Sequence, residues 1–159
     1  MSKAIFEEEQ QFRQWWIWVI LALVAGSITL NYMEAENPKI TDSIVPISVF
    51  VLILLLMFTA KLSTRIDEKG IHVKFFPFHF SYKNYTWEDM STAKVTKYSP
   101  LGDYGGWGLR FSFRGKGKAF NVSGDQGIWL ETFSGKKRMI GTQKANEAEL
   151  VLNNYFAKS

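Results

Sequence analysis

Two stretches of the chain, WWIWVILALVAGSITLNYM at residues 15–33 and IVPISVFVLILLLMFTA at residues 44–60, contain no charged side chain. A helix rises 1.5 Å per residue, so about 17–25 apolar residues cross a hydrocarbon core roughly 30 Å thick. Backbone groups find no water there, and both stretches must therefore be helical. We predict two membrane-spanning helices. The alternative, a buried hairpin of a soluble protein, is disfavoured because neither stretch has a polar face.

The ten residues between the stretches, 34–43, include the turn signal Asn37-Pro38, which predicts a helical hairpin with both chain ends on one side. Lysine and arginine are enriched on the cytoplasmic side of a membrane. The connection has only Lys39, whereas six basic residues flank the outer ends of the hairpin: Lys3, Arg13, Lys61, Arg65, Lys69 and Lys74. We therefore predict a two-pass protein of the cytoplasmic (inner) membrane with both termini in the cytoplasm.

A cleaved signal peptide is the alternative for the first stretch. Its N-terminal flank contains Glu7, Glu8 and Glu9, whereas a signal peptide begins with a positively charged region. Residues 1–14 are thus predicted to be a cytoplasmic N-terminal segment, followed by the hairpin over 15–62.

Residues 63–159 show a different pattern, in which apolar and polar residues alternate as in half-buried strands. The clearest strand is Trp107, Leu109, Phe111 and Phe113 alternating with polar residues and glycine. Residues 146–157 repeat apolar side chains at helical spacing after the cap-like Asn146 and Glu149. The fold class predicted is a membrane α-helical hairpin plus an α+β domain, an antiparallel barrel or sandwich capped by a C-terminal helix. We expect seven or eight strands, near residues 63–67, 71–75, 80–87, 93–98, 107–114, 118–122, 127–133 and 137–141.

Several runs resemble an uncharacterised bacterial family of membrane-anchored pleckstrin-homology-like (PH-like) domains with two N-terminal transmembrane helices. These runs are QFRQWW at 11–16, WEDM at 87–90, YSPLGDYGGWGLR at 98–110, AFNVSG at 119–124 and IGTQ at 140–143. The resemblance covers nearly the whole chain. It implies a PH-like fold and a membrane location, and it implies no activity.

The composition excludes several kinds of site. The chain has no cysteine and only two histidines, His72 and His79, so we predict no metal and no cofactor. A net charge of +4 does not indicate nucleic acid binding. The glycine-rich run at 105–108 lacks the lysine and the serine or threonine of a phosphate-binding loop. The two spans contain no acid, base or histidine, which argues against transport.

The candidate contact surface is a rim of aromatic residues beside an arginine, a combination typical of binding hot spots. It comprises Tyr98, Tyr104, Trp107 and Arg110. The alternative is that the aromatics are core and Arg110 is simply solvated. Residues 63–159 carry fifteen Lys/Arg against nine Asp/Glu, a surplus that an anionic leaflet would attract. We expect a non-catalytic module that binds a protein partner or lipid head groups; the alternative is an accessory subunit of a membrane enzyme or transporter.

Overall fold

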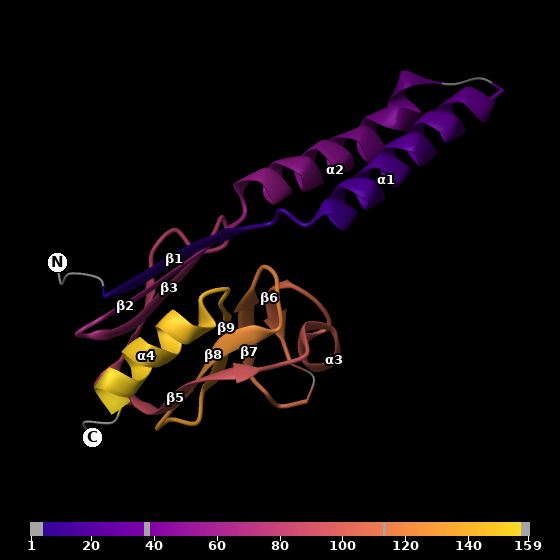
Figure 1. The fold of residues 1–159 in the computed structure, drawn as a ribbon. Coiled ribbons are helices and arrows are strands. Elements are labelled where there is room, and N and C mark those ends of the chain that lie inside the picture. Colours follow the sequence, from indigo (N-terminus) through magenta and orange to yellow (C-terminus); the bar gives the residue numbers. More distant parts are fainter. Residues whose placement is uncertain (1–4, 37–38, 113, 157–159) are drawn as a thin grey trace. The chain divides into compact units, whose positions relative to one another are not determined.

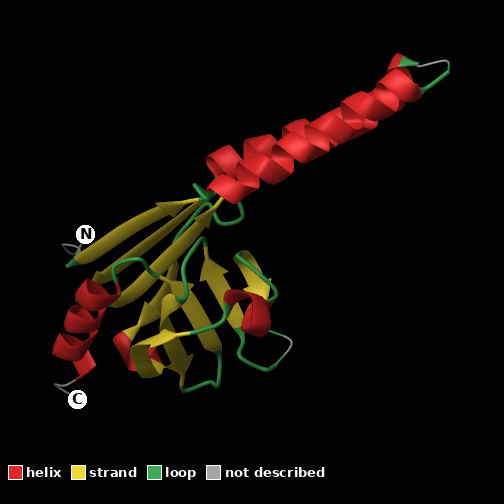
Figure 2. Ribbon diagram, turned by 45° about the vertical axis from the view of Figure 1, so that its right-hand side comes forward, coloured by secondary structure: helices red, strands yellow, loops and turns green. Residues whose placement is uncertain are grey.

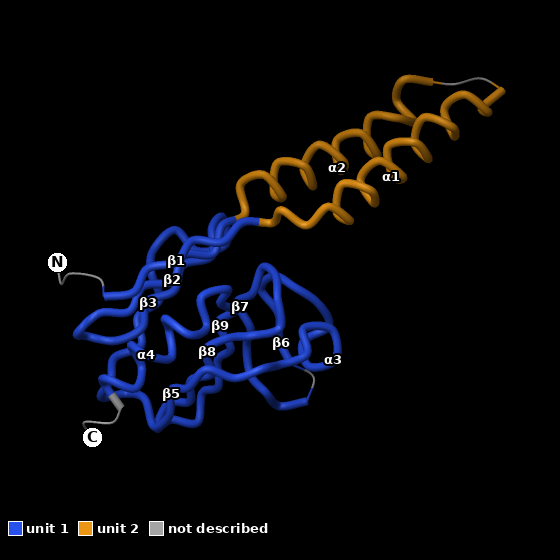
Figure 3. Tube along the Cα trace, viewed as in Figure 1, with its two compact units in different colours: residues 1–11, 61–159 blue, residues 12–60 orange. Residues whose placement is uncertain are grey.

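The structure is a computed structural model that describes residues 5–36, 39–112 and 114–156. The chain divides into two compact units. One is a helical unit, residues 12–60, and the other is a β unit formed by residues 1–11 together with residues 61–159 (Figure 3). The helical unit is therefore an insertion within the sequence of the β unit.

The helical unit is a hairpin of α1 (Trp15–Glu34) and α2 (Ile40–Thr59) (Figure 2). Both helices are long and apolar enough to cross a membrane, and most of their side chains are exposed. The second helix begins four residues before the predicted stretch. Its extra turn contains Asp42, whose negative charge is favourable at a helix N-terminus. The two helices contact each other through Trp18 and Phe58, with ring centroids 5.3 Å apart.

The β unit contains a four-stranded antiparallel sheet in the order β1-β2-β3-β4. A second, five-stranded sheet has the order β5-β8-β9-β7-β6, and only its β7–β9 pair is parallel. The first sheet consists of β1 (Phe6–Gln11), β2 (Lys61–Asp67), β3 (Gly70–Phe76) and β4 (Lys83–Thr86). The second consists of β5 (Met90–Lys97), β6 (Gly108–Phe111), β7 (Lys118–Asn121), β8 (Gln126–Thr132) and β9 (Lys137–Gly141).

Three helical segments complete the β unit: η1 (Trp87–Asp89), α3 (Pro100–Tyr104) and α4 (Ala145–Phe156). The predicted combination of a β-rich domain and a C-terminal helix is confirmed. The described strands number nine, and they form two sheets whose pairings do not show a closed barrel. Phe113, expected in the strand at 107–114, lies outside the described residues.

Strand β1 corrects the prediction that residues 1–14 are a separate segment. It pairs antiparallel with β2 along its whole length, from Phe6 opposite Ile66 to Gln11 opposite Lys61. Alternate side chains of β1 are buried, namely Phe6, Glu8 and Gln10. The three consecutive glutamates therefore belong to a strand whose faces differ, with Glu8 inside and its two neighbours outside.

Polar contacts tie β1 to the second sheet as well. The Glu8 carboxylate accepts hydrogen bonds from the Thr142 hydroxyl (2.5 Å) and the Gln143 backbone N–H (2.8 Å). The Gln10 side chain donates to the Gly141 carbonyl (2.8 Å). Burial of the Glu8 carboxylate is tolerated because each of its two oxygens accepts a hydrogen bond. Strand β1 thus bridges the two sheets.

The apolar core of the β unit is built from alternate residues of the strands. Helix α4 packs against β1, β5 and β8, and it buries Ala148 and Leu152 (Figure 1). At the end of this helix, the Tyr155 ring stacks on Trp87 with centroids 4.8 Å apart. The fully buried side chains from the strands include Leu62, Ile66, Ile71, Val73, Phe75, Phe120, Ile128, Leu130 and Ile140.

Candidate functional site

The outer face of the five-stranded sheet carries a row of residues in register across all five strands. Lys94 of β5 lies opposite Trp129 of β8, which lies opposite Met139 of β9. Met139 in turn lies opposite Ala119 of β7, and Ala119 opposite Arg110 of β6. Residues opposite each other in a sheet point to the same face. The row therefore places an apolar centre between two cations.

Helix α3 covers the middle of this row, at Ala119 of β7 and Met139 of β9. Ser99 caps the helix by accepting a hydrogen bond from the Gly102 N–H (3.1 Å), and Pro100 occupies the first turn. Tyr98 and Tyr104 pack edge to face, with centroids 5.9 Å apart, in a small cluster with Ala119 and Met139. This cluster forms the floor of the outer face.

The placement of Tyr98 and Tyr104 differs from the predicted exposed rim. Their exposed fractions are 8% and 1%, so neither offers a free aromatic surface. The Tyr98 hydroxyl accepts a hydrogen bond from the Asn121 side chain (3.0 Å), and the Tyr104 hydroxyl donates to the Lys116 carbonyl (3.1 Å). Burial, followed by the charge of Asp103, raises the pKa of Tyr104 to about 12. Tyr104 therefore keeps its proton and its hydrogen bond at neutral pH.

Trp107 and Arg110 lie together at the β6 edge of the same sheet. The Arg110 Nε donates to the Trp107 carbonyl (3.0 Å), and the Trp107 indole donates to the Gly124 carbonyl (3.3 Å). Arg110 is exposed, whereas Trp107 is half-buried. Gly105, with φ +70°, ends α3 in the left-handed conformation that leads the chain into this edge. The structure therefore divides the four predicted residues into two pairs.

A groove of about 380 Å³ lies over the outer face between β5, α3, β8, β9 and the loop that joins β6 to β7. Half-buried Trp129 and buried Met139 lie in it, with Tyr98 and Tyr104 at its α3 end. The charged residues lining the groove are five cations and one acid: Lys94, Lys97, Arg114, Lys116, Lys137 and Asp103.

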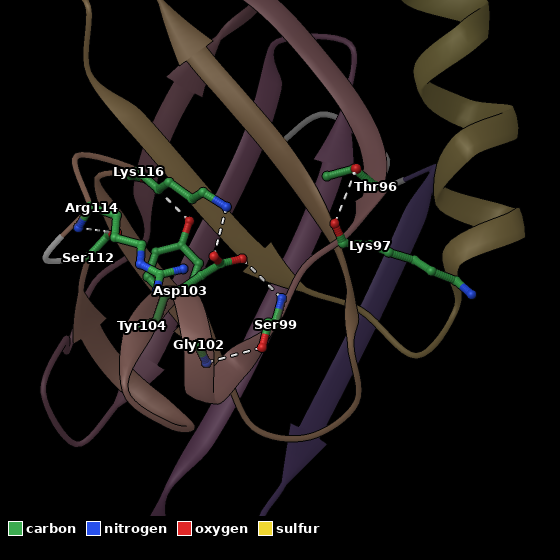
Figure 4. Close-up of polar contacts among 9 residues, drawn as sticks. All are labelled: Thr96, Lys97, Ser99, Gly102, Asp103, Tyr104, Ser112, Arg114 and Lys116. Atoms are coloured by element: carbon green, nitrogen blue, oxygen red, sulfur yellow. Dashed lines mark hydrogen bonds and ion pairs between the residues drawn. The ribbon is translucent and has the colours of Figure 1, made fainter.

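The cations differ in where they point. Figure 4 shows Lys116 and Arg114 on the side of Asp103, whereas the Lys97 ammonium extends away from it. Lys137 lies 3.9 Å from Glu131. Lys94 has no ion pair among the residues that the structure describes. The groove thus keeps a surplus of positive charge beside an aromatic floor.

Asp103 fixes one wall of the groove (Figure 4). Its carboxylate accepts hydrogen bonds from the Lys116 ammonium (2.7 Å) and the Ser99 backbone N–H (3.0 Å). These two bonds, that from Lys116 first, hold the pKa of Asp103 below its usual value. Because Lys116 lies in the β6–β7 loop, this ion pair fastens that loop to α3.

The groove is not evident from the sequence because its cations come from segments far apart in the chain. The signal that could have found it is the position of Lys94, Trp129 and Lys137 on the outward side of alternating strands. Among the described residues, no group of three or more histidines, aspartates or glutamates could hold a metal ion. No family model, curated protein or solved structure matches this chain.

Proposed function

We propose that this protein is a two-pass membrane-anchored, non-catalytic module of PH-like type. In this proposal the β unit lies at the cytoplasmic face of the inner membrane and docks an acidic segment of a protein partner in the basic groove.

The observation that carries the proposal is the groove itself, in which cations surround Trp129 and the aromatic floor. Interfaces use such charge to steer an oppositely charged partner, and buried aromatics with adjacent apolar groups to hold it. A protein segment supplies both carboxylates for the lysines and an apolar side chain for the floor. A lipid head group supplies only the anion, so the half-buried Trp129 favours the protein segment.

The membrane anchor is supported by the position of the helices in the chain. Helices α1 and α2 connect Gln11 to Lys61, which are opposite each other in paired strands. A connection that leaves and returns at neighbouring residues needs an even number of membrane crossings. Two apolar helices meet this need, and the predicted excess of lysine and arginine at their outer ends favours a cytoplasmic β unit.

The test is binding of a labelled poly-glutamate peptide to the full chain in nanodiscs of zwitterionic lipid. We expect the double variant Lys94→Glu/Arg114→Glu to lose about tenfold or more in affinity, since it reverses two charges in the groove. The matched control is Lys69→Glu, an exposed lysine in the turn between β2 and β3, which should bind as wild type.

Equal binding by wild type and the double variant would overturn the groove as the docking site. A second arm measures recruitment of a soluble acidic head group, inositol phosphate, to the same nanodiscs. If inositol phosphate binds through Lys94 and Arg114 and the peptide does not, the ligand is a phosphate and the proposed protein segment is wrong.

A further inference from the structure

The loop between β3 and β4, residues 77–82, presents two exposed aromatic side chains. Phe78 and Phe80 are 57% and 79% exposed. Each nevertheless packs against the end of β3: Phe78 stacks on Phe75, and Phe80 meets Phe76 edge to face, both with centroids 5.8 Å apart. The rings are thus held in place on the β unit while much of their surface remains uncovered.

His79, between the two phenylalanines, points the other way. Its ring lies 5.7 Å from that of buried Phe120, and its backbone N–H donates to the Phe75 carbonyl (2.8 Å). Burial, followed by the charges of Lys83 and Lys118, lowers the pKa of His79, so the ring is neutral at pH 7. These contacts of His79 hold the loop on the β unit, while its two neighbours, Phe78 and Phe80, stay exposed.

The strand register places this loop at one end of the four-stranded sheet. Gln11 lies opposite Lys61, and Lys61 lies opposite Phe76. The chain leaves this row at Gln11 toward α1, which begins at Trp15. It returns to the row at Lys61 from α2, which ends at Thr59. The row is therefore the end of the β unit from which both apolar helices are reached. The exposed phenylalanines follow Phe76 by two and four residues.

Cations surround the base of the loop. Arg65 and Lys74 lie over the Tyr82 ring, at 5.3 and 5.9 Å from its centroid. Aromatic rings and long basic side chains are the groups that favour the boundary between lipid and water, where an apolar body and a charged tip are both accommodated. Anionic head groups add an attraction for Lys74, whereas the charge of Arg65 is already paired with Glu7.

From this juxtaposition we propose that loop 77–82 is a membrane-contact element in which Phe78 and Phe80 enter the interfacial layer of the bilayer that holds α1 and α2. The occupant of this surface is lipid. The inference rests on the helices spanning the membrane, and it concerns a surface separate from the basic groove. It gives the β unit a third attachment to the bilayer besides the two chain connections.

The experiment uses single-cysteine variants of the full chain in lipid vesicles, each labelled with an environment-sensitive fluorophore. The chain has no cysteine of its own, so each label is unique. Phe80→Cys reports on the loop. The matched control is Phe133→Cys, since Phe133 is 76% exposed and its N–H donates to the carbonyl of Asp89, beyond the opposite end of β4. Leu23→Cys, within α1, reports on the span.

We expect a blue-shifted emission at position 80 and strong quenching by lipids brominated near the head group. Position 133 should show an aqueous spectrum without quenching. If position 80 behaves as position 133 while position 23 is quenched by lipids, the loop does not contact the membrane and the proposed anchor stands. If position 23 is not quenched either, the anchor and the loop contact are both wrong.

Phe78→Cys provides a second reading if the label at position 80 disturbs the fold. It should show the same blue shift and quenching, and an aqueous spectrum there would overturn the proposal. The peptide-binding test of the groove is independent of these labels, so the docking proposal and the loop proposal can fail separately.

Discussion

The outer faces of the two sheets use charged residues in different ways. On the four-stranded sheet, cations are paired with acids on the neighbouring strand: Arg65 with Glu7 and Lys61 with Glu9, both at 2.6 Å. On the five-stranded sheet, Lys94 has no ion pair among the described residues, and Lys137 is 3.9 Å from its nearest carboxylate. Among the described cations of the groove, only Lys116, in the β6–β7 loop, has a close partner, Asp103 at 2.7 Å.

The ion pairs of the four-stranded sheet help to specify the pairing register of β1 on β2. Strands β1 and β2 are separated by the entire helical unit, so no short turn fixes their register. Opposite charges facing each other across the pair favour one register, and a slip by one residue would also expose the buried side of β1. In the five-stranded sheet, the β6–β7 and β8–β9 hairpins have short connections that set their register. Strand β5, which carries Lys94, pairs instead with the distant strand β8, and burial of Ala93, Ile128 and Leu130 on one face favours a single register there.

The largest effect is expected from Glu8, the acid of β1 that faces inward. Glu8→Ala removes the acceptor of two hydrogen bonds and leaves the Thr142 hydroxyl and the Gln143 N–H without it. We expect a loss of about 2–4 kcal/mol in the free energy of unfolding. Hydrogen exchange of the β2 amides in detergent measures this loss of stability. Unchanged protection of these amides in Glu8→Ala would show that β1 does not hold the sheets together.

A smaller effect is expected from Asp103, which forms the 2.7 Å ion pair with Lys116 in the groove. Asp103→Ala should cost about 1–3 kcal/mol, since Lys116 and the Ser99 N–H lose a charged acceptor. The lowered pKa gives the pH dependence its sign. The stability that Asp103 contributes through its charged hydrogen bonds is fully present above the usual carboxyl pKa of 3.8. It is lost as the pH falls through the lower pKa that Asp103 has in the folded protein.

The measurement is the unfolding temperature of wild type and Asp103→Ala between neutral pH and strongly acidic pH. The difference between the two proteins should shrink on acidification below the usual carboxyl pKa. A difference that stays constant over that range would mean that the ion pair does not contribute.

Glu7 tests the paired face of the four-stranded sheet. Its bond to Arg65 is exposed, so Glu7→Ala should cost at most about 1 kcal/mol, and high salt should abolish the difference. The comparison with Glu8 is direct because the two residues are adjacent. Equal costs for the two variants would contradict the assignment of inner and outer faces to β1.

The smallest effect on stability is expected at Lys94, which makes no ion pair with the residues that the structure describes. Lys94→Ala should leave the free energy of unfolding within about 0.5 kcal/mol of wild type. Thermal unfolding of the two proteins in the same detergent measures this. A clear loss of stability would mean that Lys94 has a structural role, and the contrast between the two faces would no longer hold.

The sequence predicted those elements whose pattern is local. The two apolar stretches need no distant partner to be recognised, and α4 shows its amphipathic spacing within twelve residues. The strand expected over 80–87 is shorter, Lys83–Thr86, because Phe80 belongs to the loop that β3 and β4 share. Helix α3 had a signal that was not used, the cap Ser99 followed by Pro100.

The parts that were missed depend on distant pairing. Strand β1 reads FEEEQQ, a run that favours a solvated segment unless its partner is known. That partner is β2, which follows the helical unit in the sequence. The groups that Glu8 and Gln10 contact lie at the end of β9 and directly after it. The groove was missed for the same reason, since Lys94, Trp129 and Lys137 meet only when the sheet has formed.

The insertion of α1 and α2 between β1 and β2 also determines the order of events during synthesis. The ribosome makes β1 first, yet this strand has no partner until both helices and β2 have been completed. If only one helix were inserted in the bilayer, β1 and β2 would be left on opposite sides and could not pair. A wrongly inserted chain would therefore retain an incomplete β unit with unpaired strand edges, which is the kind of surface that quality-control proteases and chaperones recognise. If α1 and α2 span the membrane as proposed, pairing of β1 with β2 therefore reports that both helices have been inserted.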